Sequence, residues 1–179
     1  YDKNKKFLVF SENVYLHDKF NNLIIKSNLI EYDEKSNIIS SYGNTQINLD
    51  NNYEIDSKDI FYNRLSHKIY GKNDTFIYDK EGNIFKLRDK FNINIKKKLV
   101  NSKSSIVIDK NENKYFFEDL MIDLKENRIA GREIKVKFKK TYFGNEKNDP
   151  ILKGKSSYSD DKELKIYKTV FSTCNINNK

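Results

Sequence analysis

The sequence contains few of the residues that cross-link or break up a chain, and it has no long apolar run. Its 179 residues include one cysteine, one proline, six glycines and no tryptophan. One cysteine excludes an internal disulfide and a cysteine-rich zinc site. No apolar run approaches the roughly 18–20 residues of a membrane-spanning helix. The chain begins Tyr1-Asp2-Lys3, without a methionine or an apolar leader, so we interpret it as a mature protein or an excised fragment.

Alanine is almost absent, whereas residues that favour strands are abundant. Ala130 is the only alanine, but there are 12 tyrosines and 12 phenylalanines. Because β-branched and aromatic residues suit pleated sheets better than helices, this composition favours strands. The length suits one domain with a core of its own, and no shift in composition marks a second one. We therefore expect residues 1–179 to form a single domain.

Short apolar segments alternate with clusters of Asp, Asn and Gly about every 8–12 residues, which is typical of all-β proteins. Several segments alternate strictly between apolar and polar residues, as at Phe91, Ile93 and Ile95. Such alternation indicates antiparallel strands with one dry and one wet face. The best helix candidate, residues 117–126, fits a strand and a turn better. The pattern predicts an all-β fold of about fifteen short antiparallel strands.

A weak internal repeat relates two parts of the chain. Ser27–Tyr32 (SNLIEY) aligns with Ser57–Tyr62 (SKDIFY), and both continue through a polar turn into a second short strand. Residues 102–108 and 119–131 echo the same unit. A repeated hairpin predicts strands stacked in series along one axis.

The net charge of +8 does not by itself identify an anionic partner. The lysines are scattered among aspartates and glutamates, whereas nucleic-acid footprints normally cluster, so we expect a mixed surface and no nucleic-acid partner. The densest group is Lys96-Lys97-Lys98.

No constellation for catalysis is present, so we expect neither an enzyme nor a cofactor. His17 and His67 are far apart, and neither has a companion at metal-ligand spacing. There is no glycine-rich phosphate loop or nucleophile elbow. Cys174 follows the strand-like Val170–Thr173. It is either a buried free thiol or, in an oxidising compartment, one half of a long-range or intermolecular disulfide.

Three stretches carry motifs that point to one family. In the first, Ile38–Ile47 (IISSYGNTQI) consists of a strand, a Gly-Asn turn and a strand, and Tyr53–Tyr62 follows as a similar rung. The second, Phe143–Gly154, contains Asn-Asp-Pro. The third, Leu164–Cys174, has the pattern of a closing strand that ends in a cysteine.

These stretches resemble the OstA-like family, and within it the N-terminal periplasmic domains of the lipopolysaccharide (LPS) assembly protein LptD. The resemblance runs from about Ser27 to the end of the chain, and residues 1–26 have no counterpart in it. One departure is Ile151, which stands where the family usually has arginine after Asn-Asp-Pro. Another is that no second cysteine follows Cys174 before Lys179.

The resemblance implies an open β-jellyroll, in which two antiparallel sheets fold over an apolar interior. It implies that LPS passes from a periplasmic bridge protein of the same fold, joined by β-strand addition, through the jellyroll to the chain's own C-terminal β-barrel and its lipoprotein plug. The expected location is the periplasmic face of the outer membrane. The barrel is absent from this chain, and the family's counterpart of Cys174 pairs with a cysteine near the end of the barrel.

The strictly alternating segments supply our candidates for a lipid-binding groove. The nine candidates are Phe91, Ile93, Ile95, Leu120, Ile122, Leu124, Ile134, Val136 and Phe138. Which alternation faces inward stays open, because a slip of one residue inverts it. Lys96, Lys97 and Lys98 are candidates for contact with phosphorylated headgroups. Two other interpretations remain: a soluble periplasmic bridge protein of the same fold, and a carbohydrate-binding β-sandwich or adhesin.

Overall fold

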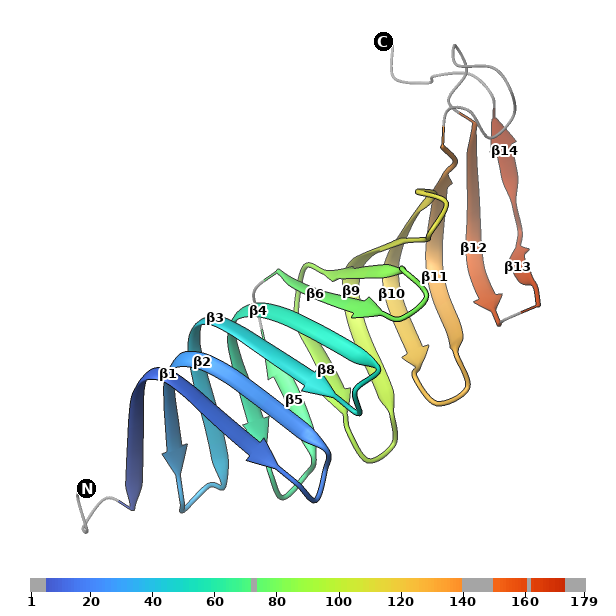
Figure 1. The fold of residues 1–179 in the computed structure, drawn as a ribbon. Coiled ribbons are helices and arrows are strands. Elements are labelled where there is room, and N and C mark those ends of the chain that lie inside the picture. The colour runs from blue at the N-terminus through green and yellow to red at the C-terminus, as the bar shows by residue number, and fades with distance from the viewer. Residues whose placement is uncertain (1–5, 72–73, 140–149, 161, 173–179) are drawn as a thin grey trace.

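The computed structural model describes residues 6–71, 74–139, 150–160 and 162–172. Across these residues the chain forms 14 strands and no helix. The strands pair antiparallel in one continuous sheet (Figure 1). The fold is all-β, with the form of an open β-jellyroll, which confirms the predicted fold class.

The strands follow one another along the sheet nearly in sequence order, from β1 at one margin to β13 and β14 at the other (Figure 1). The first eight are β1 (Phe7–Asp18), β2 (Leu23–Asp33), β3 (Ile38–Leu49), β4 (Tyr53–Asn63), β5 (Lys68–Gly71), β6 (Thr75–Asp79), β7 (Ile84–Leu87) and β8 (Phe91–Asn94). The others are β9 (Leu99–Ile108), β10 (Lys114–Asp123), β11 (Arg128–Lys137), β12 (Ile151–Ser159), β13 (Leu164–Tyr167) and β14 (Val170–Ser172).

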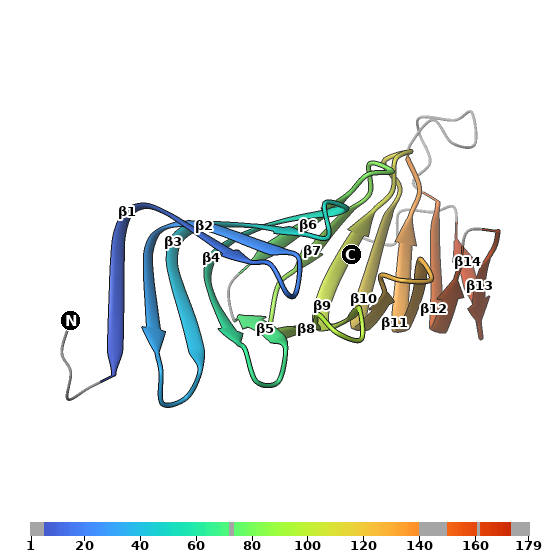
Figure 2. The ribbon, with the colours of Figure 1, turned by 60° about the horizontal axis from the view of Figure 1, so that its bottom comes forward.

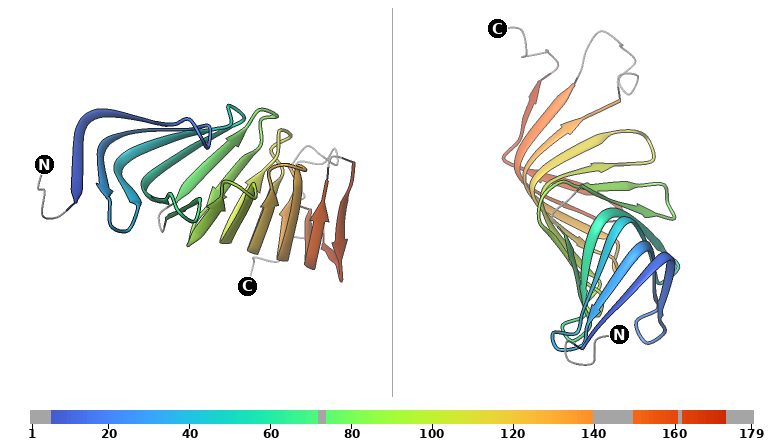
Figure 3. Two further views of the ribbon diagram at one scale, coloured as in Figure 1. Left: turned by 90° about the horizontal axis from the view of Figure 1, so that it is seen from below. Right: turned by 90° about the vertical axis from the view of Figure 1, so that its left-hand side faces the viewer.

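Each long strand bends near its middle, so the sheet folds over into two layers (Figures 2 and 3). In β4, residues 53–57 pair with β6, whereas residues 61–63 pair with β5. In β9, residues 99–102 pair with β8, whereas residues 106–108 pair with β7. We call the layer that contains β5 and β8 the first layer. We call the layer that contains β6 and β7 the second layer. The bend explains why the sequence reads as short strands: one long strand contributes two short arms.

The bend follows a line of β-bulges and small hydroxyl side chains, here called the crease. Register shifts in β1 to β3 occur between Ser11 and Val14, between Lys26 and Leu29, and between Tyr42 and Thr45. Ser27 is buried there and donates a hydrogen bond to the carbonyl of Tyr42 at 2.9 Å. A bulge leaves backbone groups without a ladder partner. The buried hydroxyl satisfies such a group where the strand turns.

Further hydroxyl pairs continue the crease across the sheet. Ser41 and Thr45 share a hydrogen bond of 2.7 Å, and Ser57 and Thr75 share one of 2.8 Å. Ser27 and Ser57, which open the two copies of the sequence repeat, occupy matching places in β2 and β4. The repeat therefore marks successive strands that cross the crease in the same way.

Two glycines on the crease lie under aromatic rings. A Cβ atom at Gly71 would meet the ring of Phe91 at 2.8 Å, and one at Gly131 would meet the ring of Phe117 at 2.2 Å. Neither glycine has a positive φ, so what they provide is space. A glycine in a strand commonly marks such a close approach.

Aspartates shape the turns that connect the strands. The Asp79 carboxylate accepts the backbone N–H groups of Glu81 and Asn83 at 2.9 and 2.8 Å. The Asp109 carboxylate accepts those of Asn111 and Asn113, both at 2.9 Å. Such side chain-to-backbone bonds hold a turn without help from the rest of the fold. Four of the polar clusters that separate the apolar segments in the sequence, at residues 18–22, 50–52, 79–83 and 109–113, contain such turns.

Candidate functional site

The space between the two layers, here called the interlayer groove, holds the apolar side chains that alternate inward from the strands. Eight of the nine groove candidates are buried there. Phe138, one residue beyond the end of β11, is half-buried and packs against the same core. All nine side chains therefore face the groove, as the alternating pattern of the sequence suggested. Their contact with lipid stays a prediction.

The middle of the groove is filled by the protein's own side chains. Ile69, Ile77, Leu87 and Ile93 have no exposed surface, and together with their neighbours they form one continuous core. Burial of each such side chain stabilises the fold by about 1.5–3 kcal/mol. The nine candidates lie mainly in this packed part, so none of them lines the hollow ends of the groove described next.

A cavity of about 510 Å³ opens between the layers at the β1 end. We call it the β1-end cavity. Its apolar wall is formed by Leu8, Phe10, Leu16, Ile30, Tyr32 and Ile39. Its polar rim includes His17, Asp18, Lys19 and Arg64. Phe10 is 47% exposed, so a large apolar side chain lies in solvent at the mouth of an apolar hollow.

A second cavity, of about 260 Å³, lies between the layers toward the other margin. We call it the β13-end cavity. Its apolar wall is formed by Val107, Tyr115, Phe117, Ile129 and Leu164. Acidic and amide groups surround it, among them Glu81, Asp109 and Asp160. The groove is thus hollow near both margins of the sheet and packed between them.

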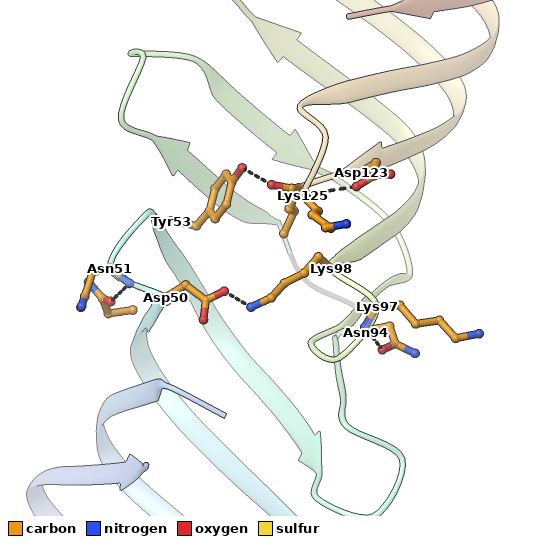
Figure 4. Close-up of polar contacts among 10 residues, drawn as sticks. Asp50, Asn51, Tyr53, Asn94, Lys97, Lys98, Asp123 and Lys125 are labelled. Carbon is orange, nitrogen blue, oxygen red and sulfur yellow. Dashed lines mark hydrogen bonds and ion pairs between the residues drawn. The ribbon is translucent and has the colours of Figure 1, made fainter. Parts of the chain in front are cut away.

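The hairpin turns at the open ends of the two layers touch along the mouth of the groove, opposite the crease. The Asp50 carboxylate, between β3 and β4, forms an ion pair with Lys98, between β8 and β9. The Tyr53 hydroxyl donates to the carbonyl of Leu124 at 3.0 Å. Figure 4 shows Asp50, Tyr53 and Lys98 bridging the gap side by side. These contacts close the middle of the mouth.

A matching contact closes the mouth beside the β1-end cavity. The Tyr62 hydroxyl in the first layer donates to the Asp18 carboxylate in the second layer at 2.8 Å. The Asn21 amide donates to the same carboxylate and to the Tyr62 oxygen, both at 2.9 Å. Toward the other margin, the Asn127 amide donates to Glu81 at 3.2 Å. We call these contacts and the two of Figure 4 the mouth clamps.

The clamps are polar, and their ionisation reflects partial burial. Burial raises the pKa of the Tyr62 hydroxyl, and its bond to Asp18 raises it further. Burial alone would raise the pKa of Asp18, but hydrogen bonds from Asn21 and Tyr62 outweigh that effect and hold it below its ordinary value. Burial lowers the pKa of Lys98. An exposed ion pair contributes up to about 1 kcal/mol, and a hydrogen bond about 0.5–1.5 kcal/mol, or up to about 3 kcal/mol where it meets a charged group. The mouth is therefore closed by a few individually modest contacts.

The clamp at Asp18 should make stability depend on pH. The pKa of Asp18 is lower in the folded than in the unfolded chain. Its contribution is therefore present above about pH 4 and is lost as the pH falls through the folded pKa. We expect Asp18→Asn to lower the urea midpoint at pH 7 and to change it less at pH 3. The exposed Asp89→Asn is the control, and an equal effect of Asp18→Asn at both pH values would contradict the prediction.

The lysines considered for headgroup contact lie at the mouth. Lys96 and Lys97 are exposed in the turn between β8 and β9, whereas Lys98 is engaged by Asp50. Two of the three charges therefore face solvent beside the groove, and one serves as a clamp.

Sequence reasoning missed the residues that line the cavities. Leu8 and Phe10 lie in the first 26 residues, for which the resemblance offered no counterpart. The signal available there is the apolar, strand-like run Phe7–Phe10. The expected closing strand, Leu164–Cys174, is split at Lys168, whose φ is +52°, into β13 in the first layer and β14 in the second. Cys174 and the Asn-Asp part of Asn148-Asp149-Pro150 lie outside the described residues.

Within the described ranges, the structure brings together no group of three or more side chains able to hold a metal ion. His17 lies in β1, and His67 lies in the turn between β4 and β5. No helix long and apolar enough to cross a membrane occurs in the same ranges. No protein-family model and no curated protein matches the chain.

Proposed function

We propose that this chain is a non-enzymatic conduit for LPS at the periplasmic face of the outer membrane. Its interlayer groove would receive the acyl chains from a periplasmic bridge of the same fold and pass them to a β-barrel. The observation that carries the proposal is the groove itself, an apolar trough that is hollow at both ends. Its support beyond the fold is the family resemblance of the sequence.

The physical need for such a trough follows from the hydrophobic effect. Exposing one acyl chain of about 12 carbons to water costs on the order of 10 kcal/mol, at roughly 0.8 kcal/mol per methylene group. Several chains on one lipid make unaided transfer through water prohibitive. The apolar walls of the β1-end cavity offer the chains a dry surface, and the mouth leaves the sugar headgroup outside.

The packed middle sets the condition for passage. Acyl chains can replace the contacts of Ile69, Ile77 and Ile93 only when the layers separate, because these side chains now fill the space. The mouth clamps oppose that separation, and they are individually modest polar contacts. Lys96 and Lys97, exposed beside the mouth, would face the phosphates of a headgroup as it moves along.

The sheet margins supply the proposed docking edges. β1 pairs only with β2, so its other edge is unpaired within the described chain. An unpaired edge is a template for strand addition. The bridge protein would add its terminal strand there, and the barrel would follow the other margin.

A photo-crosslinking amino acid on β1 tests the proposal. Phe10 lines the β1-end cavity, whereas Val9 is the next residue, does not line it, and is 57% exposed. We expect position 10 to capture LPS and position 9 to remain at background. Ile93 tests the packed middle in the same way, with the adjacent Asn92 as its control. Equal capture at positions 9 and 10 would contradict the proposal.

One observation favours the carbohydrate-binding alternative. Phe61 and Tyr70 stack at 5.5 Å, and Tyr42 meets Phe61 edge-on at 6.3 Å. These rings come from β3, β4 and β5 in the first layer and alternate with the buried groove residues. Aromatic platforms of this kind can stack against sugars. Capture of LPS through its sugar at position 70, with none at position 10, would select this alternative. A soluble bridge protein would share the groove and give the same result as the conduit.

A further inference from the structure

The outward surface of the second layer, over β6, β7, β9 to β12 and β14, combines lysines with apolar side chains. Cross-strand register aligns them in rows. Phe116 lies opposite Lys135, Lys135 opposite Lys153, and Lys153 opposite Val170. In the next row, Ile108 lies opposite Lys114 and Lys114 opposite Lys137. We call this surface the basic face.

Like charges stand directly against each other on the basic face. Lys114 pairs across strands with Lys137, and Lys135 with Lys153. Like charges in such positions destabilise a sheet. No carboxylate forms an ion pair with any of these four lysines among the residues that the structure describes. The arrangement is therefore unfavourable for the isolated sheet.

The ionisation of Lys135 reflects its burial and the neighbouring positive charges. Burial, and then the charges of Lys137 and Lys153, lower the pKa of its ammonium group. An anion placed over the three lysines would relieve the repulsion among them.

Apolar side chains flank the charges and give the face two chemical characters. The Lys137 ammonium lies 5.7 Å from the ring centre of Phe116, and that of Lys86 lies 5.0 Å from that of Phe76. Val170 is 67% exposed beside Lys153. Lysine stems and aromatic rings combined in this way suit a boundary where hydrocarbon meets charged headgroups.

We propose that the basic face binds the surface of an anionic phospholipid bilayer. The unpaired lysines would contact the headgroup phosphates, and Phe116 and Val170 would reach the upper acyl region. A second copy of the same face is excluded by charge, since lysines would meet lysines. A polyanion without hydrocarbon would leave the apolar side chains unused. This inference does not depend on lipid binding in the interlayer groove.

The test is flotation of the full chain with vesicles of phosphatidylcholine and phosphatidylglycerol. Each lysine near an anionic surface contributes about 1 kcal/mol. Lys135→Gln combined with Lys153→Gln should therefore weaken binding about thirtyfold. The matched control is Lys35→Gln combined with Lys68→Gln, which removes the same charge from exposed positions elsewhere. We expect the control pair to bind nearly as well as the native chain.

Four results would overturn the proposal: unchanged binding by the Lys135 and Lys153 pair, an equal loss in the control pair, equal binding to vesicles of phosphatidylcholine alone, or binding only to soluble polyglutamate. These vesicles contain no LPS. Failure of the vesicle experiment would therefore say nothing about the crosslinking experiment at Phe10 and Val9. Failure of the crosslinking experiment would likewise say nothing about binding of the basic face to vesicles.

Discussion

A covalent link across the mouth is expected to stop lipid from reaching the middle of the groove. Asp50 and Lys98 already hold the two layers together there by an ion pair. Asp50→Cys and Lys98→Cys, joined by a short bismaleimide in a Cys174→Ser background, would make that contact permanent. On the proposed function, the part of the lipid that joins the acyl chains to the headgroup would have to pass through the mouth. A permanent link should therefore reduce capture of LPS at position 93 to the background seen at position 92.

Two comparisons make this result specific. The same double-cysteine chain without the bismaleimide should capture LPS at position 93 at least as well as a chain that keeps Asp50 and Lys98, because the ion pair between the layers is lost. Capture at position 10, in the β1-end cavity, should persist in the linked chain, since the apolar wall of that cavity lies on β1 to β3. Undiminished capture at position 93 after linking would show that lipid does not need the mouth to open.

Replacing Gly131 with valine is expected to have the largest effect on stability. A Cβ at this position would lie 2.2 Å from the Phe117 ring and 3.3 Å from the carbonyl oxygen of Asp119. The ring is buried in the core and cannot swing into solvent without losing its contacts. We expect Gly131→Val to destabilise the chain by about 3 kcal/mol, at the upper end of overpacking effects. The urea-unfolding midpoint measures this loss.

Ala130→Val is the matched control, because its side chain lies one residue away on the opposite face of β11. Valine suits strands, so we expect a change within about 0.5 kcal/mol. A second test uses Phe117→Ala, which removes the ring that the new Cβ would meet. The double variant should lose clearly less stability than the sum of the two single changes. Simple additivity would show that the ring is not the obstacle.

Local features of the fold follow directly from the sequence. The inward facing of Ile93 and Ile95, and of Ile134 and Val136, follows from strict alternation within one arm of a strand. Turn positions follow from aspartates such as Asp79, whose carboxylate can bond to the backbone that follows it. Both depend on neighbouring residues only, and short-range chemistry determines them.

Features beyond one arm could not be derived in the same way. In β2, Leu23, Ile25 and Ser27 face inward, but past the bulge the inward residues are Ile30 and Tyr32. The alternation changes phase there, and a continuous period of two would have placed Leu29 inside. The splitting of the sheet around β5 to β8 is likewise set by pairing between distant segments. The cavities and the mouth clamps depend on that pairing and cannot be read from one segment. For this reason the nine groove candidates from the sequence lie mainly in the packed middle and not at the cavities.

The crease has a mechanical consequence. In β1 to β4, the register between neighbouring strands shifts along the line of bulges where the layers join. In this part of the sheet the two layers can therefore change their angle about that line while the backbone hydrogen bonds within each layer stay intact. Hydrogen exchange should then report slowly exchanging amides in both layers of β1 to β4 even when the layers separate.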